Sequence, residues 1–395
     1  MIRANFDQTR HFLLTKNFLA IRTEFDLPTS VRSLVALPAF DVTGPFLALW
    51  ARLADFSPPA LPAALDQERI LMKRPAMRNE PHLIALEDFV TFLVATERQR
   101  RQTFNAECLH WQIDQAEVEA LAGAVLDALN AEPAPVDEIA SRLSPEKVHK
   151  LTHTSRGGRV SETTSLELAL NRLEARGHLA RREVAPPESW QVEATYYAPL
   201  STWWPDLDLT PDLTEAEAQQ RLVRAYLSAY GPVTEADISF WSGLGKSETQ
   251  RAVSALSGET TLAMVEGIPG AMLLLKTQAD ALGSTHPPAT PVINLLPAND
   301  PFIRAHKASR GRLFATPDPR LQRQVFSNTD RAKATVVLNG QIVGAWDWQP
   351  SDQPQTISWS LFTSLERDLL TAIQTEFEKL AAFVGAQDVI KLAAA

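Results

Sequence analysis

The chain has 395 residues, of which 45% are hydrophobic and 22% are charged. That length exceeds one ordinary hydrophobic core and predicts several domains, and the composition is typical of a globular protein rather than a disordered one. A single cysteine, Cys108, excludes an intramolecular disulfide framework and a cysteine-based zinc site. The formal net charge of −9 argues against a nucleic-acid partner unless the cations gather on one face.

Charge is unevenly distributed along the chain. Between Arg304 and Lys333 there are eight Lys or Arg residues against two acids, whereas residues 206–217 carry five acids and no base. This pattern allows one basic face on an acidic molecule. The opening sequence MIRANFDQTRHFLL lacks the apolar segment of a signal peptide, and no window approaches the length of a membrane span. We therefore expect a cytoplasmic protein without a membrane partner.

Residues 1–112 are predicted to form a first winged-helix module. Three helices are expected, and a fourth, short helix runs from residue 64 to Arg74, where Pro75 breaks it. A β-hairpin follows across MRNEPHLIAL. The order of three helices and a hairpin is that of a winged helix. The expected helices cover residues 8–21, 28–37 and 45–53, and beyond the hairpin residues 86–101 and 114–130.

Two further modules are predicted, at residues 113–205 and 206–286. In the second, VDEIASRLSPEKVHKLT resembles the paired helices of a helix-turn-helix, and a later helix stopped by Gly177 leads into a strand. Residues 191–200 alternate as a strand. In the third, Thr234 with Asp237 is expected to cap a helix. A helix over 247–256 and a hairpin over 260–276 complete that module.

Residues 287–395 are predicted to form a β-rich domain. Asn339-Gly340 between alternating runs is a strong hairpin signal. RLFA, RQVF and residues 357–362 are interpreted as further strands, and residues 364–384 as one closing helix. The expected fold class is therefore α+β: three tandem winged-helix modules, then a β-rich, small barrel-like domain with a helix packed on it.

Five blocks of this sequence occur in the order typical of one known family. They are LALWARL, MRNEPHL, LVRAYLSAYGPVTEADISFWSGLG, INLLPANDPFIRAHKASR and VVLNGQIVGAWDW. Together they resemble the winged-helix DNA-binding family that includes the bacterial alkylation and crosslink-repair DNA glycosylases, the AlkZ-like proteins. The resemblance implies double-stranded DNA, intact or damaged, as partner. It also implies a DNA-repair hydrolase that excises an alkylated base without metal or cofactor.

The resemblance places the catalytic groups in the turn before LALWARL. In the glycosylases this turn carries two glutamines, separated by one residue, that hold the catalytic water and the excised nucleotide. The matching positions here are Pro38 and Phe40, whose side chains neither donate nor accept a hydrogen bond. Asp41 is the only acid in the turn. It is the candidate catalytic residue, as a general base or electrostatic stabiliser, and the alternative is that it caps the following helix.

Candidate DNA-binding residues occur in two places. Arg78 and His82 flank the hairpin of the first module, where an arginine can contact a phosphate. The others follow the INLLPANDPF block and are Arg304, His306, Lys307, Arg310 and Arg312. The alternatives are a core histidine at position 82 and a solvated charged loop at 304–312.

The sequence carries no sign of a metal or nucleotide site. The histidines lack zinc-ligand spacing, and neither a phosphate-binding loop nor a dinucleotide fingerprint occurs. Three functional hypotheses follow. The chain is a monofunctional glycosylase with an altered active site, or a non-catalytic DNA-binding or regulatory protein on the same scaffold. The third hypothesis is a small-molecule protein in which Pro38, Phe40 and Trp50 line an apolar cavity.

Overall fold

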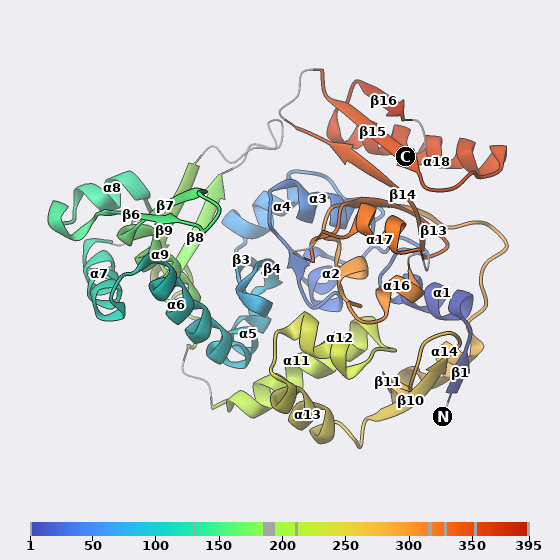
Figure 1. The fold of residues 1–395 in the computed structure, drawn as a ribbon, viewed down its shortest axis with the longest axis horizontal. Coiled ribbons are helices and arrows are strands. Elements are labelled where there is room, and N and C mark those ends of the chain that lie inside the picture. The colour runs from blue at the N-terminus through green and yellow to red at the C-terminus, as the bar shows by residue number, and fades with distance from the viewer. Residues whose placement is uncertain are drawn as a thin grey trace.

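The computed structural model describes residues 2–129, 132–184, 194–209, 212–314, 318–327, 330–350 and 354–392. It has the expected α+β fold class, with helices and mainly antiparallel strands mixed along the whole chain. Figure 1 shows a lobe formed by α7–α9 and β6–β9 beside a larger body that contains the N-terminal and C-terminal segments. Within the described ranges, no helix combines the length and apolar character needed to cross a bilayer.

The α-helices are α1 (Phe6–Lys16), α2 (Leu27–Ser33), α3 (Thr43–Trp50), α4 (Ala60–Pro62), α5 (Phe89–Ala95), α6 (Glu97–Trp111), α7 (Gln115–Ala128), α8 (Val136–Ser141), α9 (Ser165–Ala175), α10 (Leu200–Trp203), α11 (Glu215–Tyr230), α12 (Glu235–Ser242), α13 (Lys246–Ala255), α14 (Ala279–Ser284), α15 (Pro301–Arg304), α16 (Arg310–Leu313), α17 (Pro319–Val325) and α18 (Arg367–Val384). Short π or 3-10 segments occur at Ala63–Gln67, Met77–Asn79, Leu86–Asp88, Pro145–Lys147 and Lys276–Gln278.

The strands are β1 (Ile2–Ala4), β2 (Leu37–Pro38), β3 (Leu71–Pro75), β4 (Pro81–Ala85), β5 (Ala134–Pro135), β6 (Lys150–Thr154), β7 (Val160–Thr164), β8 (Leu179–Val184), β9 (Ala194–Pro199), β10 (Thr260–Val265), β11 (Met272–Leu275), β12 (Ile293–Leu296), β13 (Ala334–Leu338), β14 (Gln341–Trp348), β15 (Thr356–Leu361) and β16 (Asp388–Lys391). Their sheet orders are β1-β10-β11, β2-β4-β3, β5-β9-β8, β6-β7 and β12-β13-β14-β15-β16.

The C-terminal sheet is open, so the barrel-like expectation is wrong. Among the described residues β12 and β16 are the two edges of a five-stranded sheet, and they do not pair with each other. The expected Asn339-Gly340 hairpin is confirmed: both residues have positive φ, 50° and 79°, and they join β13 to β14. The closing helix is α18, which buries Phe377 against the indole of Trp359 in this sheet.

The predicted strands RLFA and RQVF are also wrong. RLFA overlaps α16, and RQVF overlaps α17. The side chain of Asp318 accepts a hydrogen bond from the Arg320 amide, and Pro319 follows it at the first helical position. An Asp-Pro pair of this kind is a helix-start signal, and it outweighs the apolar residues that suggested a strand.

Three predictions in the first half of the chain require correction. The short helix expected to reach Arg74 ends at Gln67, because Arg69 adopts a left-handed φ of 56°, and β3 then replaces helix. The helix expected over 86–101 is broken at Thr96, whose hydroxyl donates to the Phe92 carbonyl. The second helix of the expected helix-turn-helix is instead one 3-10 turn followed by the β6–β7 hairpin.

Several other local predictions are confirmed. Gly177 has a φ of 77° directly after α9, and the next strand is β8. Thr234 and Asp237 form the expected capping box of α12. The hairpins β3–β4 and β10–β11 occur where hairpins were expected, and the strand expected over 191–200 is found as β9, with residues 191–193 outside the described ranges. The division into winged-helix modules and their boundaries stay predictions.

Segments far apart in sequence share buried cores. One core joins apolar residues between positions 13 and 85 to residues between 265 and 384. Within it the guanidinium of Arg52, after α3, makes two hydrogen bonds to the Asp300 carboxylate, at 2.8 and 2.7 Å, and both side chains are fully buried. This ion pair joins LALWARL to INLLPANDPF, and the Asp300 side chain also caps α15.

Candidate nucleic-acid interface

The turn of the β3–β4 hairpin presents Arg78. Arg78 and Asn79 have positive φ, 58° and 55°. The amide of Arg78 donates to Oε1 of Gln99 on α6, and Nε2 of Gln99 donates to the Ser242 carbonyl at the end of α12. A Cβ at Gly243 would lie 2.5 Å from the Gln99 oxygen, so this clamp requires glycine there. Gln99 thereby links this turn to the end of α12.

The loop after α15 is held by buried polar groups of α11 and α12. Oδ1 of Asp237 accepts hydrogen bonds from the amides of Ala308 and Ser309, at 2.6 and 3.3 Å. The Tyr226 hydroxyl donates to the Ala305 carbonyl at 2.5 Å. Nε2 of the fully buried His306 lies 3.0 Å from the Tyr230 carbonyl. These contacts fix the backbone that carries the cations of this loop.

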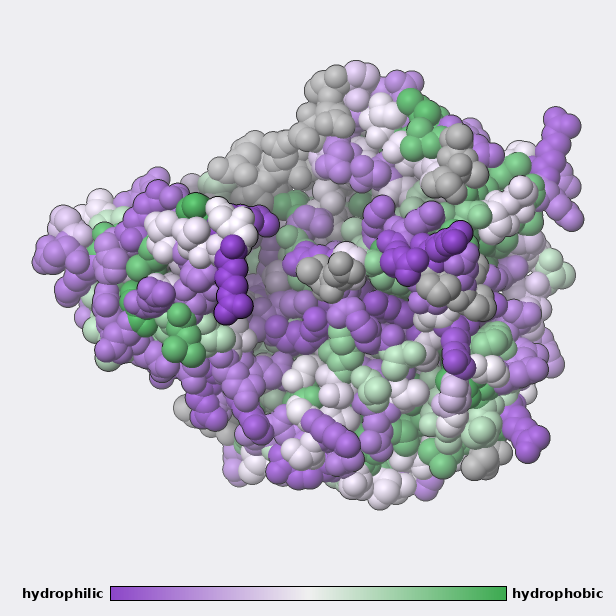
Figure 2. Space-filling model, viewed as in Figure 1, coloured by the Kyte–Doolittle hydropathy of each residue, from purple (hydrophilic) through white to green (hydrophobic). Residues whose placement is uncertain are grey.

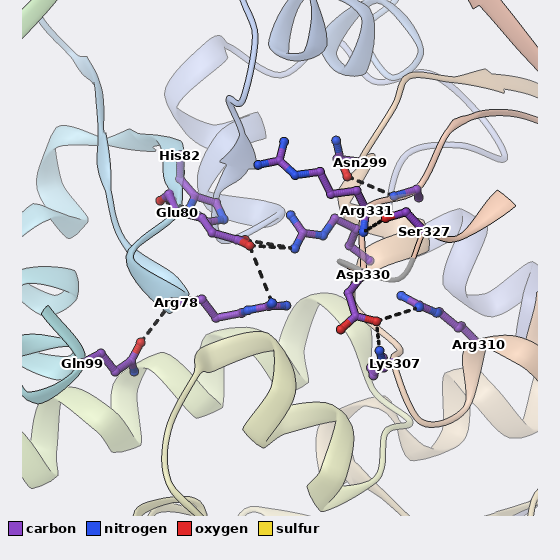
Figure 3. A network of polar contacts seen from close by, with 12 residues as sticks. Arg78, Glu80, His82, Gln99, Asn299, Lys307, Arg310, Ser327, Asp330 and Arg331 are labelled. Atoms are coloured by element: carbon purple, nitrogen blue, oxygen red, sulfur yellow. Dashed lines mark hydrogen bonds and ion pairs between the residues drawn. The ribbon is translucent and has the colours of Figure 1, made fainter. Parts of the chain in front are cut away.

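Figure 3 shows Arg78, Lys307, Arg310 and Arg331 near one another, and Arg304 joins them through its ion pair with Glu80. We call Arg78, Arg304, Lys307, Arg310 and Arg331 the cation cluster. Two carboxylates lie among them. Glu80 pairs with Arg304 at 3.0 Å and with Arg78 at 3.7 Å, while Asp330 pairs with Lys307 and, at 3.3 Å, with Arg310. The cluster has a formal excess of three positive charges on an acidic protein.

Every member of the cation cluster lies over a phenylalanine ring. Arg331 and Arg304 lie over Phe40, with guanidinium carbons 3.8 and 5.0 Å from the ring centroid. Arg78 and Lys307 lie over Phe240 at 4.2 and 5.1 Å, and Arg310 lies over Phe326 at 3.8 Å. Each such contact contributes about 0.5–1 kcal/mol. The rings therefore hold the cations in place in addition to the carboxylates.

Burial and mutual repulsion affect the protonation of the cluster. Burial, followed by the charge of Arg304, lowers the pKa of Arg310 to about 10. Burial likewise lowers the pKa of Arg304, opposed by Glu80. Arg310 nevertheless stays protonated at neutral pH. Arg331 is exposed, and it makes no ion pair with any carboxylate that the structure describes.

Pro38 and His82 lie side by side next to the cluster. They are partners in the antiparallel pairing of β2 with β4. His82 is buried, its Nδ1 lies 2.8 Å from the Glu80 carbonyl, and burial lowers its pKa to about 4, so the ring is neutral at physiological pH. Pro38, His82 and Arg304 line a cavity of about 20 Å³, enough for one water molecule. The side chain of Pro38 has no hydrogen-bonding group.

The remaining candidate residues are not members of the cluster, and of these Asp41 lines a surface hollow together with Arg331. Asp41 is exposed, and its Oδ1 accepts from the Gly44 amide at 2.7 Å and the Thr43 hydroxyl at 2.9 Å, so it caps the start of α3. Arg312 is exposed and donates to the Gly267 carbonyl. His306 lies beneath the loop and does not reach solvent. Burial also lowers the pKa of His306.

The face viewed in Figure 2 is hollowed between the left lobe and the body, and hydrophilic side chains border the hollow. The β6–β7 hairpin belongs to this lobe, and in Figure 1 its turn points from the lobe toward the body. Arg156 and Arg159 lie in that turn, and both are exposed. Sequence reasoning missed these arginines because the expected helix-turn-helix ended at Thr152 and no element was assigned to the residues after it, although the Gly157-Gly158 pair between the two arginines is a turn signal.

Arg331 was not among the predicted site residues either. The run of eight cations between Arg304 and Lys333 was the signal that could have indicated it. The three residues of the small-molecule hypothesis have different surroundings in the part of the chain that the structure describes. Pro38 lines the water-sized cavity beside His82, Phe40 contacts the guanidinium groups of Arg304 and Arg331, and Trp50 is buried beside Phe383. Among the described residues, no three His, Cys, Asp or Glu side chains are placed to hold a metal ion.

Comparisons with known proteins agree with this architecture. A family model described as "DNA glycosylase AlkZ-like" matches residues 31–383. Among solved structures, the Streptomyces sahachiroi DNA glycosylase AlkZ is similar, with a TM-score of 0.76, 20% sequence identity and 100% of each chain covered. No curated protein sequence matches the chain. At that identity the structural likeness shows a shared fold.

Proposed function

The chain belongs to the AlkZ-like DNA glycosylase family, and from that premise we propose that it binds double-stranded DNA, intact or damaged, through the cation cluster. The observation that carries the proposal is the set of five cations held over three phenylalanine rings. Phosphate binding gains from cations that are fixed before the ligand arrives, since less side-chain freedom is lost on binding. The exposed arginines of the β6–β7 turn supply further positive charge across the hollow.

We propose in addition that this protein does not excise bases by the glutamine-dependent route. The guanidinium groups of Arg304 and Arg331 both lie over the Phe40 ring, and this ring has no polar atom that could bind a water molecule. Pro38 lines the water-sized cavity beside His82, and its side chain has no atom that donates or accepts a hydrogen bond. Compared with the glutamines of the glycosylases, Phe40 offers an aromatic ring and Pro38 a rigid side chain, and neither side chain can form a hydrogen bond. This difference favours DNA binding over hydrolysis of the glycosidic bond.

The scaffold proposal extends to the modules. We propose that residues 1–112, 113–205 and 206–286 are winged-helix modules whose hairpins and loops border the hollow in Figure 2. Duplex binding would then place the β3–β4 and β6–β7 turns on phosphates. Because these turns would contact the phosphates of the DNA rather than the edges of its bases, we expect the protein to bind duplexes with little preference for sequence.

The experiment is titration of a fluorescent 20-base-pair duplex by anisotropy between 50 and 200 mM salt. We expect saturable binding whose affinity falls steeply with salt, because phosphate contacts release counterions. The comparison duplex carries an abasic-site analogue. Failure to bind either duplex at 50 mM salt would overturn the proposal.

A second candidate function is base excision that uses Asp41. One observation favours it: Asp41 is exposed, and among the described residues its Oδ2 makes no hydrogen bond, so that oxygen is free to accept a proton from water. The test is alkaline cleavage of alkylated duplex after incubation with the protein. Strand breaks made by the wild type and absent with Asp41→Asn would establish this function, and intact strands would exclude it.

A further inference from the structure

A cavity of about 210 Å³ lies on the other side of the segment that carries Pro38 and Phe40. Ala39 and Asp41 line this cavity, whereas Pro38 and Phe40 face the cation cluster. Its walls come from α3, the helical turns after residue 60, the β3–β4 hairpin, β8, β9 and α10. The cavity therefore lies between residues 39–83 and residues 133–204, and no member of the cation cluster lines it.

The cavity walls are mainly apolar and rich in aromatic rings. The lining residues include Phe46, Leu65, Tyr196, Tyr197, Trp203 and Trp204. Protein interiors are close-packed and leave few voids larger than a water molecule. An apolar cavity of about 150 Å³ holds a benzene ring. A cavity of this size therefore accepts one ring or two fused rings.

The charged groups in the wall are paired with one another. Asp66 forms an ion pair with Arg182, with 2.8 Å between Oδ1 and Nε, and burial raises the pKa of the Asp66 carboxyl. Glu183 pairs with Arg181 at 2.8 Å and with Lys73 at 2.5 Å. Each of these three cations already has a carboxylate. The wall therefore offers little to an anionic ligand.

Asp41 is the carboxylate of the wall that has no ion pair among the described residues. Its Oδ1 accepts two hydrogen bonds at the start of α3, and its Oδ2 makes no hydrogen bond among the described residues. A hydrogen-bond donor or an ammonium group on a bound molecule would satisfy this oxygen, because charge-assisted hydrogen bonds to carboxylates are strong. The cavity thus combines aromatic walls with a carboxylate that has no ion pair among the described residues.

We propose that this cavity is a binding site for a small aromatic molecule of one ring or two fused rings, uncharged or carrying one ammonium group that Asp41 binds. The proposal goes beyond DNA binding and does not depend on it, because none of the cluster residues lines the cavity. A bound molecule would contact both residues 39–83 and residues 133–204, so its binding would stabilise the packing of these two parts of the chain against each other.

The experiment is isothermal titration calorimetry of the full chain, without DNA, with three matched probes: indole, tryptamine and indole-3-acetate. We expect indole to bind, tryptamine to bind about tenfold more tightly through its ammonium group, and indole-3-acetate to bind more weakly than indole. In Asp41→Asn the advantage of tryptamine over indole should fall to about twofold or less. Absence of binding by all three probes at millimolar concentration, or tightest binding by indole-3-acetate, would overturn the proposal.

Two filling variants locate the site. Leu65→Trp puts an indole into the cavity from a half-buried wall position, and Ala198→Leu adds three carbons from β9 on the other wall. Leu109→Trp, at an exposed position on α6, is the matched control. We expect indole affinity to fall at least tenfold in both filling variants and to be unchanged in the control, with unfolding temperatures checked for all three. Equal affinity in the filling variants and the control would place indole elsewhere and overturn the proposal.

Discussion

Removal of the Arg331 side chain is the sharpest perturbation of the cation cluster. Its guanidinium lies 3.8 Å over the Phe40 ring and has no carboxylate partner among the described residues. The other four cations each pair with Glu80 or Asp330. Arg331 is therefore the cation that can meet a DNA phosphate without first leaving an ion pair.

The expected magnitude follows from counterion release. One phosphate contact contributes about 0.9 to the slope of log affinity against log salt, which is about eightfold in affinity at 0.1 M salt. Arg331→Ala should lower the slope and the affinity by these amounts. Its effect on the free energy of unfolding should stay below about 1 kcal/mol, because the side chain is exposed and loses one cation–π contact.

The assay is anisotropy titration of a labelled duplex at five salt concentrations. Arg331→Lys keeps the charge and should keep the slope, although it loses the planar contact with Phe40. Arg367→Ala, which removes an exposed arginine at the start of α18, is the matched control and should behave as the wild type. If the slopes of Arg331→Ala and Arg367→Ala are equal, Arg331 contacts no phosphate and the reasoning is refuted.

Three further predictions concern stability and chemistry. Asp300→Asn should lower the free energy of unfolding by about 3–5 kcal/mol, because it leaves the charge of buried Arg52 without a partner. Glu87→Gln, which breaks the exposed ion pair with Arg32, is the control and should lower it by less than about 1 kcal/mol. Equal losses for the two variants in urea titrations would contradict this prediction. His82 has a pKa near 6.5 in the unfolded chain and about 4 in the folded protein, so the free energy of unfolding decreases as the pH is lowered from 7 to 4. Over this range His82→Gln should lose about 3 kcal/mol less of its free energy of unfolding than the wild type. Identical pH dependence of the two proteins in urea titrations would disprove the assignment. Asp41→Ala should destabilise by about 1 kcal/mol through loss of the α3 cap, and no change in urea midpoint would count against that cap.

Local signals in the sequence were reliable guides to the fold. Asn339-Gly340, the Thr234 and Asp237 capping box, and Gly177 after α9 each act through backbone conformation or one neighbouring hydrogen bond, so short stretches determine them. Short apolar runs were unreliable. RLFA and RQVF lack the length that separates strand from helix, and a proline with an aspartate cap decided the second of them.

The candidate site was only partly predictable for a related reason. The sequence indicated a cationic loop at 304–312, but tertiary packing decides which side chains of that loop reach solvent. His306 is buried against Tyr230, while Lys307 reaches Asp330. Contacts between distant segments, such as Phe40 with Arg331, follow from no local pattern. The same holds for the Arg52–Asp300 pair, 248 residues apart in sequence.

The most direct test of the central claim measures binding and excision in the same tube. The protein, in excess over a labelled duplex that carries alkylated bases, is incubated at 50 mM salt; anisotropy reports the fraction of DNA bound, and alkali then reveals abasic sites as strand breaks. The account predicts that the duplex is fully bound and its strands stay intact. Strand breaks from the bound duplex would contradict the loss of excision, and free duplex under these conditions would contradict DNA binding through the cation cluster.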